Sequence, residues 1–214
     1  MDSDHAAGNI TTMASHPPPP RYAEEHDQVI VLPNVSWEQY EAICDARDKR
    51  PRLAYLDGAL ELMTTSMRHE LAKKLIARLL EMYALEHRVP LTGVGGTTWR
   101  NKRRKAAAEA DECYFIGKGR KRPPDLAIEV VFKSGGIDKL EIYRRLRVRE
   151  VWFWIDGRFW LYALVDEVYV EVRASTILPG FDLDEIARIL LTSDDDDDQT
   201  EIVGAYRDAL RRRA

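Results

Sequence analysis

The clearest pattern in the chain is a helical repeat of apolar residues in the segment "TTSMRHELAKKLIARLLEMYALEH". Leucine and methionine recur there at about 3.6-residue spacing without an intervening Gly or Pro, which predicts a long amphipathic helix. The repeating positions are Leu71, Leu75, Leu79 and Met82. Shorter helices are predicted in "NVSWEQYEAICDAR", where Ser36 can cap the first turn, in "IDKLEIYRRLRV" and in "FDLDEIARILL".

Between these helices the pattern changes to runs of apolar and β-branched residues, which predict strands. "RLAYLDGALELM" is typical of a hairpin, because Asp57-Gly58 suits a tight turn with positive φ at both central positions. Further strands are predicted in "VPLTGVGGTTWR", "DECYFI", "DLAIEVVF", "EVWFWID" and "RFWLYALVDEVYVEV". The order of elements predicts an α/β (α+β) fold, with a mixed β-sheet flanked by helices and an N-terminal β-hairpin.

The two ends of the chain differ in pattern from the rest. Residues 1–28 are polar and include "HPPPP", so we expect a disordered leader there. Residues 29–192 make up the predicted domain. Residues 193–214 contain five consecutive aspartates, Asp194 to Asp198, and are predicted to form an acidic linker and a C-terminal tail, in which "TEIVGAYRDALRRRA" favours a terminal helix.

Composition narrows the class of protein. No apolar run approaches the roughly 18 residues of a membrane-spanning helix, and the N-terminus lacks the basic and apolar stretches of a secretory signal. Cys44 and Cys113 are the only cysteines, too few for a disulfide framework and wrongly spaced for a zinc site. We therefore expect a cytoplasmic protein with no membrane partner.

Two acids stand in the otherwise apolar strand "PPDLAIEVV". Removing an ionised carboxylate from water costs several kcal/mol unless it is paired or bound to metal. Asp125 and Glu129 share a strand face but lie about 13 Å apart, so they cannot share one ion. Asp125 follows two prolines and is interpreted as structural, marking where the strand leaves water, whereas Glu129 has apolar neighbours on both sides.

Partners for Glu129 must come from neighbouring elements. If "ADECYFI" pairs antiparallel with "DLAIEVV", Asp111 approaches Glu129 across a strand spacing of about 4.8 Å. Two carboxylates at that distance share a proton or hold a hard cation such as Mg²⁺. Glu70, in "MRHE" at the start of the long helix, either adds a third carboxylate or interacts only with the helix dipole.

These segments resemble a known family. The segments that carry the resemblance are "PPDLAIEVV" followed by "SGGIDKLEIYRRLRVREVWFW", with "ADECYFI", "YLDGALELM" and "RHE" upstream. In these segments the chain is similar to the Uma family of restriction-endonuclease-like domains, also called domain of unknown function 820. The resemblance covers residues 37–191. It implies the mixed sheet and flanking helices of the PD-(D/E)xK nuclease superfamily, and a Mg²⁺- or Mn²⁺-dependent endonuclease that hydrolyses phosphodiester bonds in DNA.

The resemblance also implies residue roles. It puts Asp111 and Glu129 at the metal-binding positions and Glu70 at the helical acidic position. Val131 stands two residues beyond Glu129, where the superfamily has its lysine. In this family the lysine is carried by the following helix, which here means Lys139.

Two further points qualify these roles. Lys133 competes with Lys139 as the lysine that serves the site. Ala110 stands where a proline usually precedes the aspartate, a change in backbone shape rather than in ligands.

The net charge of −4 argues against general attraction to nucleic acid, but basic residues gather on both sides of "AEADECYFI". With DNA as the implied partner, we expect them to contact the phosphate backbone; a solvated charged loop is the alternative. The residues predicted to bind are Arg100, Lys102, Arg103, Arg104 and Lys121.

Two alternatives of another kind stay open. A catalytically inactive relative can keep the fold as a nucleic-acid or protein interaction module. The aromatic residues of the last strands either pack within the sheet or form a homodimer surface. They are Trp152, Phe153, Trp154, Trp160 and Tyr162.

Overall fold

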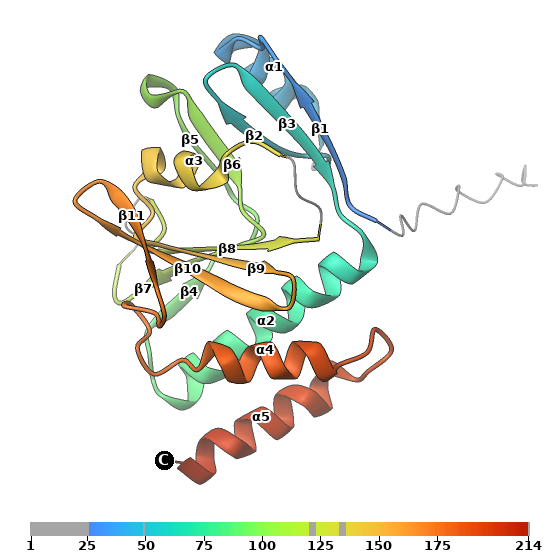
Figure 1. Cartoon of the computed structure of the whole chain (residues 1–214), viewed down its shortest axis with the longest axis vertical. Coiled ribbons are helices and arrows are strands. Elements are labelled where there is room, and N and C mark those ends of the chain that lie inside the picture. The colour runs from blue at the N-terminus through green and yellow to red at the C-terminus, as the bar shows by residue number, and fades with distance from the viewer. Residues whose placement is uncertain (1–25, 49, 120–122, 133–135, 214) are drawn as a thin grey trace, which may run out of the picture.

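The computed structural model describes residues 26–48, 50–119, 123–132 and 136–213, whose strands form two sheets (Figure 1). The five-stranded sheet is antiparallel, in the order β1-β3-β2-β6-β5. Its strands are β1 (Gln28–Leu32), β2 (Arg52–Leu56), β3 (Ala59–Thr64), β5 (Thr98–Asn101) and β6 (Ala106–Glu109). It contains the predicted hairpin, since β2 and β3 pair across Asp57 and Gly58, which both have positive φ.

The six-stranded sheet has the order β11-β10-β9-β8-β7-β4. Its strands are β4 (Leu91–Gly93), β7 (Glu112–Ile116), β8 (Leu126–Val131), β9 (Glu150–Ile155), β10 (Arg158–Val165) and β11 (Val168–Val172). All neighbours are antiparallel except β8 and β9. A parallel pair needs a crossover connection, and here a helix supplies it. This crossover brings the end of β8 next to the start of that helix.

Helices cover both faces of the six-stranded sheet (Figure 1). The helices are α1 (Trp37–Ala46), α2 (Met67–Glu86), α3 (Lys139–Leu146), α4 (Leu183–Thr192) and α5 (Gln199–Arg213), with a short 3₁₀ turn at Lys102–Arg104. The crossover helix α3 packs between the two sheets, while α2 and α4 cover the opposite face of the six-stranded sheet and α5 packs on α2. Helix α1 packs its buried Trp37 and Tyr40 on the five-stranded sheet.

The long predicted helix is confirmed as α2. Ser66 caps it by accepting a hydrogen bond from the His69 backbone N–H at 3.2 Å. Leu75 and Leu79 are buried against Ile128 of β8 and the rest of the larger core. None of the helices within the described ranges has the length and apolar character that a membrane crossing requires.

The predicted tail is wrong in one respect, because its helix belongs to the core. Val203, Tyr206 and Leu210 of α5 are buried in the same cluster as α2, and the Gln199 side chain donates to the Leu71 carbonyl at 3.2 Å. The helix itself was predicted, but its packing against the core was not, because its apolar positions are few and widely spaced.

The N-terminal boundary also shifts. Gln28 opens strand β1, and Asp27 is buried, although both were assigned to the leader; residues 1–25 lie outside the described residues.

The single predicted sheet is in fact two, and "VPLTGVGGTTWR" contributes to both. Gly95 adopts positive φ between β4 and β5, which lie in different sheets. Strand β6 was missed because three of its four residues are alanines, which favour strands weakly. The aromatic residues Trp152, Phe153 and Trp154 are buried in the two main clusters, as expected for packing within the fold.

Candidate active site

Glu129, near the end of β8, is held by two side chains of α3. Its Oε2 accepts a hydrogen bond from Lys139 Nζ at 2.8 Å, and its Oε1 accepts one from the Tyr143 hydroxyl. Lys139 and Tyr143 share a helix face because they are four residues apart. Burial, reinforced by the Glu129 charge, raises the pKa of Tyr143 well above its ordinary value. The phenol therefore stays protonated and donates to the carboxylate.

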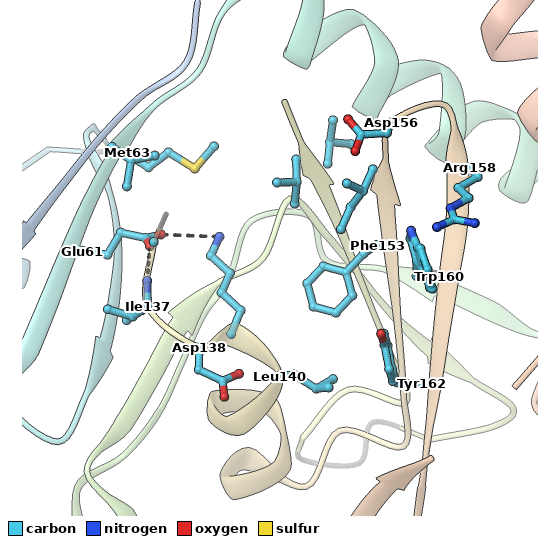
Figure 2. A pocket seen from close by; sticks show the side chains of 16 residues that line it. Glu61, Met63, Ile137, Asp138, Leu140, Phe153, Asp156, Arg158, Trp160 and Tyr162 are labelled. Atoms are coloured by element: carbon cyan, nitrogen blue, oxygen red, sulfur yellow. Dashed lines mark hydrogen bonds and ion pairs between the residues drawn. The ribbon is translucent and has the colours of Figure 1, made fainter. Parts of the chain in front are cut away.

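A second buried acid, Glu61 of β3, reaches the same lysine from the other sheet (Figure 2). Its Oε1 lies 3.7 Å from Lys139 Nζ, and its Oε2 accepts from the Ile137 backbone N–H at 2.9 Å. Gly136 leaves room for this carboxylate, since a Cβ there would overlap Glu61 Oε2. Burial disfavours the ammonium, but Glu129 and Glu61 outweigh it and raise the pKa of Lys139. Lys139 therefore carries its charge between two carboxylates.

Asp111 immediately precedes β7, the strand that pairs with β8 and so neighbours Glu129. Glu112 pairs with Ile128 in the antiparallel ladder, which sets Asp111 next to Glu129 along the two strands. Its Oδ2 accepts from the Val130 backbone N–H at 2.7 Å. The predicted antiparallel pairing of these two strands is thus present, and it fixes one carboxylate oxygen of Asp111 to the backbone of β8.

The other oxygen of Asp111 faces two side chains that donate or carry positive charge. His69 Nε2 lies 2.9 Å from Oδ1, and the Arg52 guanidinium forms an ion pair with the same oxygen. His69 is itself anchored, because its Nδ1 lies 2.7 Å from Asp27 Oδ2. Burial opposes the charge on Asp27, but hydrogen bonds from His69 and Ser66 lower its pKa. Asp27, His69 and Asp111 form a continuous buried chain.

Glu70 joins this cluster through Arg52. The Arg52 guanidinium reaches Glu70 Oε1 at 3.2 Å while pairing with Asp111. Thr65 Oγ1 donates to Glu70 at 2.6 Å, and Lys73 forms an ion pair with it. Burial opposes the charge of Glu70, but these partners outweigh it and lower its pKa to about 2. The structure thus connects Glu70 to Asp111 through a cation.

The residues predicted to contact nucleic acid lie toward the far end of α3 from Lys139. Arg100 is exposed on β5, and Lys102 and Arg103 are exposed on the 3₁₀ turn. Arg104 donates to the Arg145 carbonyl at 3.0 Å, near the end of α3. Lys102 is partly neutralised by Glu38 at 3.1 Å and Glu41 at 3.7 Å. Lys121 and the competing Lys133 lie outside the described residues.

A hollow of about 400 Å³ lies at this end. It is lined by Arg103, Arg104 and Lys105, by Arg144 and Arg145 of α3, and by the acids Asp57 and Glu167, of which Asp57 pairs with Arg145. Helix α3, with eight residues, is about 12 Å long. The acidic cluster and this basic surface therefore sit at opposite ends of one short helix.

The donor chemistry of the acidic cluster suits a hard cation. Mg²⁺ is commonly held by one or two carboxylates, with waters and substrate phosphates completing its shell. Asp111 and Glu129 supply two such carboxylates on neighbouring strands. Across the ranges that the structure covers, no group of three or more His, Cys, Asp or Glu side chains is arranged to hold a metal ion. A two-carboxylate site at Asp111 and Glu129 would require Arg52 and Lys139 to give up part of their present contacts.

Sequence reasoning missed several members of the cluster. Glu61 carried the same signal as Glu129, an acid inside an apolar strand, and that signal was available in "ALELM". Tyr143 follows Lys139 by one helical turn. Arg52, His69 and Asp27 had no local signal, because only tertiary contacts between segments far apart in the sequence bring them together with Asp111.

Comparison with known proteins agrees with this fold. The family model Uma2, described as "Putative restriction endonuclease", matches residues 37–207. The match spans both sheets except β1, and reaches into α5. No curated protein matches the chain in sequence. The mixed α+β architecture with flanking helices is that of a restriction-endonuclease-like domain, and the chain belongs to the Uma2 family.

Proposed function

We propose that this chain is a Mg²⁺-dependent endonuclease that hydrolyses phosphodiester bonds in DNA, with Mn²⁺ as an alternative ion. The observation that carries the proposal is the buried contact between Glu129 and Lys139, next to the strand that Asp111 begins. Isolated buried charges are too costly to persist, so such a group of acids and cations favours a site that handles charge.

Asp111 and Glu129 would hold the ion, which supplies an activated water and neutralises charge on the phosphate. The rest of the chemistry belongs to the chain. Lys139 keeps its proton between Glu129 and Glu61, so its ammonium is available to a phosphate oxygen. The Tyr143 hydroxyl and the Val130 backbone N–H each fix one carboxylate oxygen, on Glu129 and Asp111 respectively, and so limit how far these carboxylates turn.

The basic surface at the far end of α3 favours a polyanion as substrate. Arg103 and Lys105 would contact phosphates along a strand whose scissile bond lies near Lys139. Such contacts position a nucleic acid without reading its sequence. We therefore expect cleavage with little sequence preference and a steep loss of binding as salt rises.

The competing function is a catalytically inactive interaction module, and one observation favours it. The Arg52 guanidinium already neutralises Asp111, and His69 contacts the same oxygen. If these contacts persist when DNA binds, Asp111 has no free charge with which to hold an ion.

The two functions are separated by incubating the purified chain with supercoiled plasmid DNA in Mg²⁺, in Mn²⁺ and in EDTA, while calorimetry measures metal binding. The endonuclease proposal expects nicking in the divalent ions alone, together with measurable ion binding. DNA binding without nicking and without ion binding would establish the interaction module instead.

A further inference from the structure

A cavity of about 480 Å³ opens beside the acidic cluster (Figure 2). Glu61 and Lys139 line one side of it. Phe153, Trp160 and Tyr162 face Glu61 across the cavity. Small-molecule sites commonly have volumes of roughly 300 to 1,000 Å³, so the cavity can hold a group the size of a nucleobase.

The aromatic wall is continuous with Glu129 through the strand register. Glu129 pairs with Phe153 of β9, and Phe153 pairs with Trp160 of β10, so the three residues form one row across the sheet. Trp160 is two strands from Glu129, which is about 10 Å at the usual strand spacing. A base in contact with Trp160 would thus lie close enough for the phosphate of the same nucleotide to approach the Glu129 carboxylate.

The aromatic rings of this wall are held in place by their neighbours, which suits contact with a planar base. Phe153 and Tyr162 are packed edge to face, with centroids 5.9 Å apart. The Arg158 guanidinium lies 3.6 Å from the centre of the Trp160 ring and braces it. Lys139 and Arg158 also line the cavity, where the phosphates of a bound nucleotide would meet their charges. The acids Asp138 and Asp156 line it as well.

We propose that this cavity binds an unpaired nucleobase of the strand whose phosphate reaches Glu129 and Lys139. The inference rests on the proposed nuclease function and names its substrate class. A base stacked inside a duplex cannot enter such a cavity, so the substrate is single-stranded or locally unpaired DNA. Stacking on aromatic side chains tolerates any base, in keeping with a site that lacks sequence-reading groups.

The test measures binding without cleavage. Fluorescence anisotropy in EDTA gives the Kd for a labelled single strand of about 15 nucleotides and for the duplex of the same sequence. We expect Trp160→Ala to weaken binding of the single strand by about tenfold and binding of the duplex by less than about twofold, and Trp160→Phe to restore most of the loss. Equal Kd values for wild type and Trp160→Ala with the single strand would overturn the proposal.

Phe159→Ala is the matched control. Phe159 neighbours Trp160 on β10 but packs on the other face of the sheet, with its ring 4.8 Å from that of Trp154. If Phe159→Ala weakens single-strand binding as much as Trp160→Ala, the loss reflects damage to β10 and the proposal fails. If Trp160→Ala does not fold, tryptophan fluorescence provides a second test. The single strand should quench tryptophan emission in wild type and much less in Trp160→Phe. Equal quenching in the two proteins would overturn the proposal.

Hydrolysis in Mg²⁺ is scored separately from binding. Trp160-dependent binding of the single strand without hydrolysis would leave the base site standing and remove the nuclease function. Hydrolysis of single strand and duplex at rates that Trp160→Ala leaves unchanged would do the opposite.

Discussion

The two acids of strand β8 lie in equally buried surroundings but have different kinds of partner. Asp125, at the entry, is 3% exposed, and Glu129, near the exit, is 1% exposed. Asp125 accepts from the Ile116 backbone N–H at 2.9 Å and from the Arg149 guanidinium at 3.0 Å. Glu129 instead bonds to Lys139 and Tyr143, side chains of one helix. Burial does not separate the two acids, whereas the nature of their partners does.

A backbone N–H is fixed by the sheet, so Asp125 serves to hold strands β7 and β8 together. The ammonium that contacts Glu129 sits on a long side chain that can turn toward a substrate, whereas the phenol of Tyr143 is fully buried and holds the carboxylate in place. Glu61 supplies further negative charge nearby. The sequence interpretation placed Asp125 where the strand leaves water, but in the structure this residue is buried. Its backbone is hydrogen-bonded to the neighbouring strands on both sides, to Tyr114 of β7 and Glu150 of β9.

Replacing each of the two acids by its amide, one at a time, is expected to separate their roles by the largest effect. Glu129→Gln removes a proposed metal ligand, so we expect plasmid nicking in Mg²⁺ to fall by roughly 10²–10³-fold. Asp125→Asn leaves the proposed site intact, so its nicking rate should stay within about twofold of wild type, a change below about 0.5 kcal/mol in barrier height. Equal losses in the two variants would remove the functional distinction between the ends of β8.

Lys139 gives the next largest effect, because it stands between Glu129 and Glu61. Lys139→Met leaves two buried carboxylates without their cation, and breaking such a pair lowers the free energy of unfolding by about 3 kcal/mol. We also expect nicking to fall by about 10²-fold, since no ammonium faces the phosphate. Lys133→Met is the control for the competing lysine. If Lys133→Met abolishes nicking while Lys139→Met spares it, Lys133 serves the site.

Much of the fold could be predicted from local pattern. Helix α2, the turn at Asp57-Gly58 and the antiparallel pairing of "ADECYFI" with β8 each depend on residues close in sequence or on a simple alternation. The separation into two sheets could not be predicted, because it depends on where the chain turns at Gly95 and on an alanine strand with weak intrinsic preference.

The candidate site divides in the same way. Asp111, Glu129 and Lys139 are carried by recognisable segments. Arg52 and Asp27 enter the cluster only through tertiary packing, and a lone arginine at a strand start or an acid near the N-terminus has no local feature that marks it. Sequence therefore led to the proposed ligands and to Lys139, and missed Arg52, which neutralises Asp111.

Glu70 offers a third case beside Asp125 and Glu129, because its carboxylate is held by ion pairs with Arg52 and Lys73 and by the Thr65 hydroxyl. Its pKa is about 2 in the folded protein against an ordinary value of 4.5, so its stabilising contribution is present above pH 4.5 and is lost as pH falls toward 2. Glu70→Gln should therefore lower the free energy of unfolding at pH 7 by about 1–2 kcal/mol, after allowing for solvent screening, and progressively less below pH 4.5. Urea unfolding at several pH values measures this difference.

Asp184→Asn controls for the helix dipole in that experiment, because Asp184 is an exposed acid in the first turn of α4. A loss that is as large in Asp184→Asn, or that does not shrink at low pH, would mean that the ion pairs of Glu70 contribute little.

The smallest expected effect lies at the entry of β8. Arg149 is 59% exposed, and its ion pair with Asp125 is screened by solvent, so Arg149→Ala should lower the free energy of unfolding by about 0.5–1 kcal/mol. Arg147→Ala is the matched control, since Arg147 pairs at 2.8 Å with the exposed Glu167 and should contribute less. The difference between the two isolates what a buried carboxylate gains from a surface cation. A loss of several kcal/mol in Arg149→Ala would mean that the backbone N–H of Ile116 does not suffice for Asp125, and that both ends of β8 depend on their cations alike.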